Sequence, residues 1–338
     1  MSEIRQDKAT RDWVIIARER GKRPTDFVYS GQRPLPPAAY VETCPFCPGH
    51  EAKTPGEVLV SMNKDSSTGN NWQVRVFPNK FPALSPGGTT ERTYEGSFFM
   101  KMHGVGIHEV IVETPVHNRV MGLMETVEVE EVWRAYWERY NSLRKLKEIK
   151  LIIIFKNQGI SAGTSLEHPH SQLVAAPIWP SQVRRQLEVA MDYYNDTGRC
   201  LYFDVLDFEV KDGQRIVMQT EKFVVFHPFA SRVPFETWIM PTTHNASFGD
   251  ISSSDLSDLA CVVRANLVKL YRALNNPDYN YVIHTAPLDD ENKDYFQWHI
   301  RITPRMSQMA GFELGSGIFI NPAIPEETAV FMRDFSTD

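Results

Sequence analysis

One order of elements occurs twice along the chain, and this repetition constrains the fold more than any other feature of the sequence. From residue 74 onward the sequence predicts a strand, a strand followed by Pro and His, a helix, a strand, and a histidine-bearing strand at 167–173. The same order runs from residue 223 to a histidine-bearing strand at 296–302. Any mixed chain alternates helices and strands, but an internal duplication explains this order with fewer assumptions. We therefore predict an α+β protein with two similar halves.

The helices and the strands that follow them are the clearest copies. Residues 124–147 carry apolar side chains at the spacing of one helix face, and residues 254–274 do the same. The apolar run 150–155 follows the first helix and 279–284 follows the second, and both are typical of buried strands. Each half is thus expected to contain one long helix packed against a sheet.

Composition excludes several classes of protein. The chain has 338 residues, of which 42% are hydrophobic and 23% charged, values typical of a soluble globular protein. The net charge of −6 gives no general attraction for phosphate polymers, so we predict no nucleic-acid partner. The longest strongly apolar run, 151–155, is too short to cross a membrane, and the N-terminus lacks the apolar core of a signal peptide. We expect a cytoplasmic protein without membrane contact.

The segment 155–172 carries the strongest signal of chemistry. A strand runs into a loop with two glycines and two serines, and His168, His170 and Gln172 then alternate along an extended stretch. On a strand these three side chains would share one face. Glycines let backbone N–H groups approach a phosphate, and the hydroxyl of Ser165 can donate one more hydrogen bond.

A histidine in this setting suits attack on phosphorus. The nucleophile must be uncharged, strong at neutral pH and a good leaving group, and neutral imidazole meets all three requirements. One ring nitrogen must donate to a carbonyl, so that the other presents its lone pair. We predict His170 as the nucleophile and Gln172 as an uncharged donor to the phosphoryl oxygens. Two histidines at this spacing are also common as surface residues, so the preceding loop is what favours chemistry.

The sequence resembles the galactose-1-phosphate uridylyltransferase family at this motif. In that family a loop rich in Gly and Ser leads into His-Pro-His-x-Gln, which here is the run 165–172. The resemblance extends over nearly the whole chain, through a basic arm, a Cys-x-x-Cys pair and two further segments: 20–24, 44–47, 76–82 and 113–117. It implies two tandem histidine-triad-like halves, each an antiparallel sheet with packed helices. We place a catalytic half with a zinc site at 1–180 and a second half at 181–338.

The resemblance also implies a reaction. His170 would attack the α-phosphorus of UDP-glucose and release glucose 1-phosphate, and the nucleotidyl-histidine would then pass its nucleotide to galactose 1-phosphate in a ping-pong mechanism. By the same carry-over, six residues would contact the substrate: Arg20, Arg23, Asn79, Asn157, Ser165 and Gln172. In this family the two arginines often act across a subunit interface, so we expect a homodimer.

Cys44-Pro-Phe-Cys47 is typical of half a zinc site, because two thiolates at this spacing can occupy adjacent tetrahedral corners. The resemblance supplies His117 and His168 as the other ligands, so the protein would fill every corner and the zinc would be structural. His50 ranks lower as a substitute. A pair of buried free cysteines is the alternative without a metal.

Some relatives carry a second metal in the other half. Cys200, His244 and His299 match three of its ligands, but the second cysteine of that pair is missing here. We expect no complete second site, with Cys200 as a small buried residue.

The segment that would hold the sugar is where the resemblance is weakest. The galactose enzyme grips the hexose with a Glu and a Gln, and here Gly317 and Ala323 stand at those places, although Glu313 or Asn321 could compensate. Glycine-rich versions of this segment resemble a plant branch that acts as ADP-glucose phosphorylase, with inorganic phosphate as acceptor. Three functions stay open: first a UDP-glucose:hexose-1-phosphate uridylyltransferase, then an ADP-glucose phosphorylase, and a non-catalytic nucleotide-binding protein of the same fold.

Overall fold

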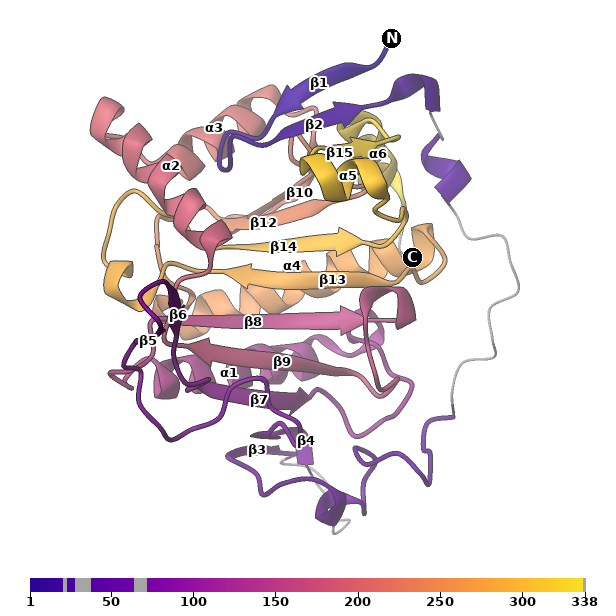
Figure 1. Ribbon diagram of the computed structural model, residues 1–338. Helices are drawn as coiled ribbons and strands as arrows, with labels where there is room; N and C mark the ends of the chain where they lie inside the picture. Colours follow the sequence, from indigo (N-terminus) through magenta and orange to yellow (C-terminus); the bar gives the residue numbers. More distant parts are fainter. Residues whose placement is uncertain (21–22, 28–37, 64–71, 337–338) are drawn as a thin grey trace.

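A computed structural model describes residues 1–20, 23–27, 38–63 and 72–336 of the chain. Ten strands of these residues form one antiparallel sheet in the order β10-β11-β12-β14-β13-β8-β9-β7-β4-β3 (Figure 1). In chain order their bounds are β3 Leu59–Met62, β4 Trp72–Pro78, β7 Ile107–Val112, β8 Leu151–Gln158, β9 His170–Ala176, β10 Ile216–Gln219, β11 Phe223–Phe226, β12 Thr237–Pro241, β13 Tyr279–His284 and β14 His299–Pro304. Strands β5 (Thr93–Glu95) and β6 (Phe99–Lys101) form a separate hairpin.

The sheet confirms the predicted pair of antiparallel halves. Outward from its centre the first half reads β8-β9-β7-β4-β3 and the second reads β13-β14-β12-β11-β10, so each strand has a counterpart at the same place. The halves join where β8 and β13 pair, with Phe155 opposite Val282 and Ile154 opposite Ile283. A single continuous sheet therefore carries both copies.

Helices α1 (Thr126–Leu143) and α4 (Ser253–Ala273) connect equivalent strands of the two halves and pack against each other on one face of the sheet (Figure 1). Their apolar sides share one core with the sheet residues that point toward them. Helix α1 begins after the predicted start at 124, because the backbone N–H of Glu125 donates to the Glu128 carboxylate at 2.7 Å in a capping box. It also ends at Leu143, before the predicted end at 147.

The other face is covered differently in each half. Helices α2 (Ser181–Thr197) and α3 (Leu201–Asp212) pack on the second half, so β11 is buried on both sides: Val224 contacts these helices, and Val225 faces α4. In the first half the Cys44–Cys47 loop covers β4 and β7. A loop rather than a pair of helices thus covers this face of the first half, beside strand β9.

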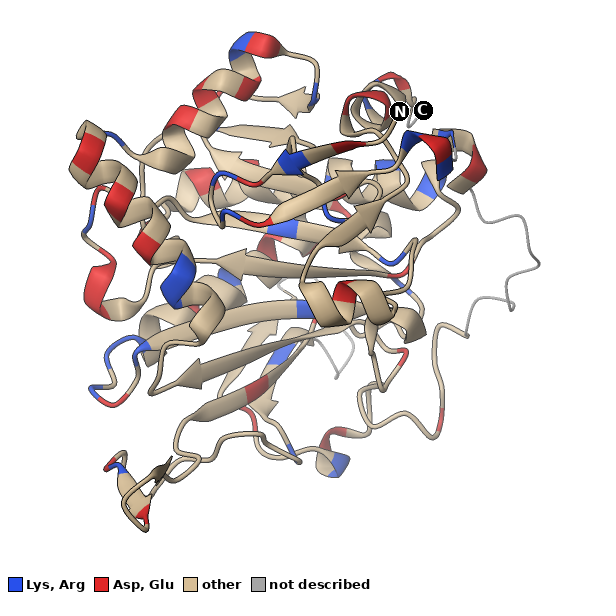
Figure 2. Ribbon diagram, turned by 45° about the horizontal axis from the view of Figure 1, so that its top comes forward, with Lys and Arg blue, Asp and Glu red and all other residues tan. Residues whose placement is uncertain are grey.

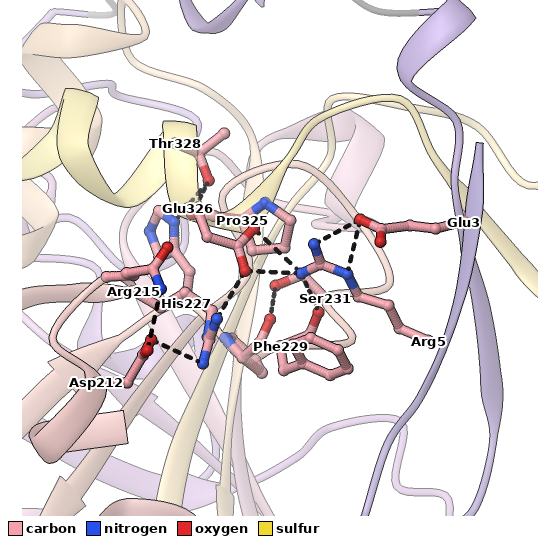
Figure 3. A network of polar contacts seen from close by, with 12 residues as sticks. Glu3, Arg5, Asp212, Arg215, His227, Phe229, Ser231, Pro325, Glu326 and Thr328 are labelled. Carbon is pink, nitrogen blue, oxygen red and sulfur yellow. Dashed lines mark hydrogen bonds and ion pairs between the residues drawn. The ribbon is translucent and has the colours of Figure 1, made fainter. Parts of the chain in front are cut away.

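The two ends of the chain meet in a small sheet of β1 (Glu3–Gln6), β2 (Trp13–Ile16) and β15 (Phe319–Asn321), near helices α5 (Gly311–Ser316) and α6 (Pro325–Asp334). Figure 3 shows the polar contacts that fasten this region. The carboxylate of Glu326 on α6 accepts from Arg5 at 2.9 Å and from Arg215 at 2.7 Å. Arg5 also pairs with Glu3 at 2.7 Å.

Some predicted details are wrong. The second histidine-bearing strand begins at His299 rather than at residue 296. Cys200 is only partly buried. In Figure 2 the Lys, Arg, Asp and Glu residues lie mainly on the helices and loops, with fewer along the strands of the sheet. Within the described ranges, every helix is too short or too polar to cross a bilayer.

Candidate active site

Four side chains gather where the Cys44–Cys47 loop meets the chain before β9. The ligand atoms of Cys44, Cys47, His117 and His168 all lie within 4.8 Å of one another, and the four residues are buried. The Cys47 Sγ lies 3.4 Å from the His117 Nδ1 and 3.7 Å from the His168 Nδ1. Neighbouring ligands on a tetrahedral zinc, with bonds of about 2.3 Å to S and 2.0 Å to N, stand about 3.6 Å apart. The donor set and its spacing therefore fit a structural zinc.

The surroundings of this cluster favour the ligand form of each group. The His168 Nε2 donates to the Thr114 carbonyl at 2.7 Å, which leaves Nδ1 without a proton and free to bind a metal. Burial lowers the pKa of His168 to about 4, so its ring is neutral at neutral pH. Burial also raises the pKa of the Cys47 thiol, so a thiolate there needs a nearby cation.

The alternatives to this ligand set receive no support from the geometry. His50 is occupied elsewhere, since its Nδ1 donates to the Cys44 carbonyl at 2.6 Å and its Nε2 lies 3.2 Å from the Tyr40 hydroxyl. Among the described residues, Cys200, His244 and His299 do not come together as a possible ligand group. His299 instead stacks between Trp238 and His284.

The candidate nucleophile, His170, stands at the first position of β9. Its Nδ1 donates to the His168 carbonyl at 2.8 Å, so Nε2 is the nitrogen that keeps a lone pair. Burial lowers the pKa of His170 below that of an ordinary histidine, because the charged imidazolium is poorly solvated there. The ring is therefore neutral at neutral pH, as attack on phosphorus requires.

His170 lines a cleft of about 440 Å³, the size of a small-molecule site. Asn157, His168 and the loop between them form one wall, and the turn after α4, with Asn275 and Asp278, forms the other. Asn157 accepts a hydrogen bond from Asn280 at 2.7 Å, which fixes its amide. The predicted site residues Asn157 and His170 thus share one cleft.

The loop before the motif is not an open phosphate cradle, contrary to the prediction. The backbone N–H of Ser161 donates to Asp278 at 2.7 Å, and the N–H groups of the next three residues bond to carbonyls within the loop. Gly159 is required for another reason: its φ is +88°, and a Cβ there would lie 1.9 Å from the Asp278 Oδ1. Ser165 is exposed and is not among the residues that line the cleft, although its neighbours Thr164 and Leu166 are.

Gln172 shares the face of β9 that His170 uses, because their positions differ by two. Its Oε1 lies 2.8 Å from the Nε2 of His108 on β7, and Asn79 also contacts His108. His108 was missed in the sequence. The available signal was a polar residue at 108 in phase with Val110 and Val112, whose side chains face the same covering loop.

Arg20 and Arg23 lie apart from these residues. They belong to the segment after β2, and neither lines the cleft around His170. Within one chain the structure does not bring them to the site.

A fully buried polar network lies behind the motif, on the α1 side of the sheet. The Lys156 ammonium donates to Glu113 at 2.5 Å and reaches the His170 carbonyl at 3.4 Å. Glu113 also accepts from the hydroxyls of Ser171 and Tyr136. The strand that carries His170 is therefore held from both faces.

Comparison with known proteins relates almost the whole chain to one family of enzymes. Residues 1–180 match the galactose-1-phosphate uridyl transferase N-terminal domain, and residues 186–316 match the C-terminal domain of the same enzyme. An ADP-glucose phosphorylase from Arabidopsis thaliana is 36% identical over 337 residues, which cover 99% of this chain and 93% of that protein. A galactose-1-phosphate uridylyltransferase from Thermotoga maritima is 28% identical over 343 residues, covering 99% of this chain and 98% of the relative.

Solved structures of the same two kinds of enzyme superpose on this chain over nearly its whole length. The crystal structure of the Arabidopsis thaliana ADP-glucose phosphorylase with bound ADP-glucose superposes with a TM-score of 0.81 at 32% identity, and covers 99% of each chain. A uridylyltransferase structure superposes with a TM-score of 0.74 at 26% identity, over 98% of this chain and 97% of the other.

The fold and its relatives define an enzyme of the nucleotidyltransferase class, with two similar halves in one antiparallel sheet. Within that class, the chain belongs to the galactose-1-phosphate uridylyltransferase family, whose two domains account for most of its length.

Proposed function

We propose that this enzyme transfers a nucleotidyl group from a nucleotide-sugar to a second phosphate through a covalent intermediate on His170. The orientation of the His170 ring carries the proposal: its Nδ1–H donates to the His168 carbonyl, and its neutral Nε2 is available in a cleft of suitable size. In the first step Nε2 bonds to the α-phosphorus and the bond to the β-phosphate oxygen breaks, which releases the sugar 1-phosphate. In the second step a phosphate oxygen of the acceptor displaces the imidazole in a ping-pong cycle.

Zinc would support this chemistry indirectly, by holding His168 in place. Cys44, Cys47, His117 and His168 would hold the ion and leave it no open corner, so its contribution would be structural. The carbonyl of His168 orients the His170 ring, so a fixed His168 fixes the nucleophile. Arg20 and Arg23 would reach the substrate only from the second copy of a homodimer.

For donor and acceptor, ADP-glucose and inorganic phosphate fit best. The Arabidopsis ADP-glucose phosphorylase is more similar in sequence than the Thermotoga uridylyltransferase, at 36% against 28% identity. The chain also lacks the polar pair expected to grip a hexose, at Gly317 and Ala323. Asn321 cannot replace that pair, because its amide donates to the Ser231 carbonyl and accepts from the Ala323 N–H at 2.8 and 2.9 Å.

UDP-glucose with galactose 1-phosphate is the second candidate, because both halves match the domains of the galactose enzyme. Glu313 is the other residue of that segment that could compensate for the missing polar pair. It lines a second cleft, although its carboxylate also accepts from the Ala310 N–H at 3.0 Å.

Labelling with donor nucleotide-sugars tests both proposals. The purified enzyme is mixed with ADP-glucose or UDP-glucose that carries ³²P at the α-phosphate, without acceptor. We expect acid-labile label on the protein and release of about one glucose 1-phosphate per active site. His170→Asn should abolish labelling, and His103→Asn, at an exposed histidine outside the cleft, should leave it intact.

A chase of the labelled enzyme with candidate acceptors identifies the acceptor. Chasing the labelled enzyme with phosphate or with galactose 1-phosphate should yield ADP in the first case if the enzyme is a phosphorylase. Labelling from UDP-glucose and a chase only by galactose 1-phosphate would favour the uridylyltransferase. A protein that binds both nucleotide-sugars without ever taking up label would be the non-catalytic alternative.

A further inference from the structure

His108 and Gln172 form a diagonal pair on the face of the sheet that carries His170. On β7 and β9, Gln172 lies directly opposite Val110, so His108 is two positions away along its strand. The His108 Nε2 and the Gln172 Oε1 are 2.8 Å apart, a normal hydrogen-bond length. No other residue of the described chain is bonded to the Gln172 side chain by a contact of this kind.

The backbone decides which nitrogen of His108 carries the proton. The N–H of Ala83 points at the His108 Nδ1 at 3.0 Å, and a backbone N–H can only donate, so Nδ1 must accept. A neutral ring then carries its proton on Nε2, which donates to the Gln172 oxygen. The Asn79 amide nitrogen, 3.2 Å from Nε2, does not compete, because two N–H groups cannot bond and the Asn79 oxygen already accepts from the Phe81 N–H.

This proton position fixes the orientation of the Gln172 amide. If the amide were reversed, its NH₂ group would face the Nε2–H of His108, which is repulsive. The oxygen is therefore turned toward His108, and the NH₂ group is left as a donor. A reversed amide would instead offer an oxygen to an anionic phosphate, which would oppose binding.

We propose that His108 is a positioning residue that holds the Gln172 amide with its NH₂ group ready for the phosphoryl oxygens of the nucleotide. The role rests on the proposed function, because it concerns the same phosphoryl transfer. His108 does not itself touch the reacting atoms. It acts by removing one of two amide orientations before substrate binds, so that the donor needs no reorganisation during the reaction.

The tautomer is measurable in the unaltered protein. Nitrogen NMR of protein labelled with ¹⁵N in its histidines distinguishes a protonated Nε2 from a protonated Nδ1. We expect His108 to carry its proton on Nε2. A proton on Nδ1 would overturn the proposal, since the ring would then accept at Nε2 and would bind the Gln172 amide in the opposite orientation.

Two matched substitutions separate the role of Nε2 from that of Nδ1. The terminal amide of Gln reaches the place of the His Nε2, whereas that of Asn reaches the place of Nδ1. His108→Ala should slow single-turnover nucleotidylation of His170 by about ten-fold or more, as expected for a misplaced phosphoryl donor. His108→Gln should restore most of the rate, and His108→Asn, which keeps an acceptor for the Ala83 N–H, should not. A purely structural role would give the reverse order.

A double-mutant cycle completes the test. With Gln172→Ala already present, adding His108→Ala should change the rate little, because the amide that His108 orients is gone. Equal slowing by His108→Ala in both backgrounds, or no slowing in either, would overturn the role of His108 while leaving His170 as the nucleophile. Failure of the unaltered protein to take up label would instead overturn the proposed function, and the role of His108 with it.

Discussion

His168 links the candidate metal cluster to the proposed nucleophile, His170. Its Nδ1 lies among the cysteine and histidine ligand atoms, and its own carbonyl accepts the Nδ1–H of His170 at 2.8 Å. Whatever holds the His168 ring in place therefore also holds the peptide that sets the His170 tautomer. A structural ion would act on the reaction through this one residue.

Cys44→Ser tests this link at the scale of one residue. The variant should lose most of its bound zinc and slow His170 labelling, because the ligand set would lack one thiolate. We expect the loss of zinc to destabilise the protein by about 2–5 kcal/mol. Each kcal/mol lowers the melting midpoint of a chain of this size by about 2 °C, so the midpoint should fall by about 4–10 °C. Metal analysis and calorimetry provide the measurements, with the exposed Cys261→Ser as control. Unchanged zinc content in Cys44→Ser would contradict the assignment.

At the scale of elements, the pair of Lys156 and Glu113 holds four elements together behind the motif. Lys156 lies on β8 and Glu113 follows β7, and both side chains are fully buried. Ser171 on β9 and Tyr136 on α1 donate to the same carboxylate. A buried carboxylate is stable only with such donors, so each strand is held to its neighbour by polar as well as apolar contacts.

Lys156→Met should destabilise the protein by about 3–5 kcal/mol, because it leaves Glu113 buried without its countercharge. Glu113→Gln, which keeps an acceptor for both hydroxyls, should then cost less in the Lys156→Met background than alone. Equilibrium unfolding in guanidinium chloride measures the four proteins of this cycle. Additive costs would show that the two charges do not depend on each other.

At the scale of the whole molecule, the two ends of the chain close the fold together. Strand β15 pairs with β2 in parallel, and Glu326 of α6 binds both Arg5 of β1 and Arg215 (Figure 3). The contact of Arg5 with Glu326 joins residues 321 positions apart, and that of Arg215 with Glu326 joins residues 111 positions apart. The ends of the chain are thus fastened to each other and, through Arg215, to the second half.

Stability should depend on pH through Glu326. Burial alone would raise the pKa of Glu326, but hydrogen bonds from Arg5 and Arg215 outweigh it and lower the pKa below the ordinary value of 4.5. Its contribution is therefore complete above about pH 4.5 and is lost as the pH falls through the lower, folded pKa. Glu326→Gln should flatten the loss of thermal stability in this acid range. Glu327→Gln, at the exposed neighbour in the same helical turn, should keep the unaltered profile. Identical profiles for both variants would contradict the assignment.

Local signals along the chain predicted the two long helices and the strands that follow them. The apolar run at 279–284 is strand β13 at the predicted bounds, and the helical pattern at 254–274 is α4 within one residue at each end. The strand at 150–155 extends to Gln158 in the structure, because pairing with β13 continues to Gln158 through polar residues that carry no apolar signal. Helices α2 and α3 were not predicted, because their sequences have no counterpart in the first half of the chain. In the structure they bury one face of the second half.

The sequence by itself determined the duplication, the ligand types at Cys44 and Cys47, and a histidine pair with the composition of a phosphoryl-transfer site, because each depends on residue type and short spacing. Only the tertiary structure decided how His168 and His170 divide their tasks. Both rings contact Phe46 of the covering loop, but the Nδ1 of His168 lies among the cysteine ligand atoms, whereas the Nδ1–H of His170 donates to the His168 carbonyl. Contacts between residues far apart in the sequence decide three other features: which nitrogen of His108 carries the proton, the burial of Lys156 and the pairing of the chain ends. The local spacing of residue types does not reveal such contacts.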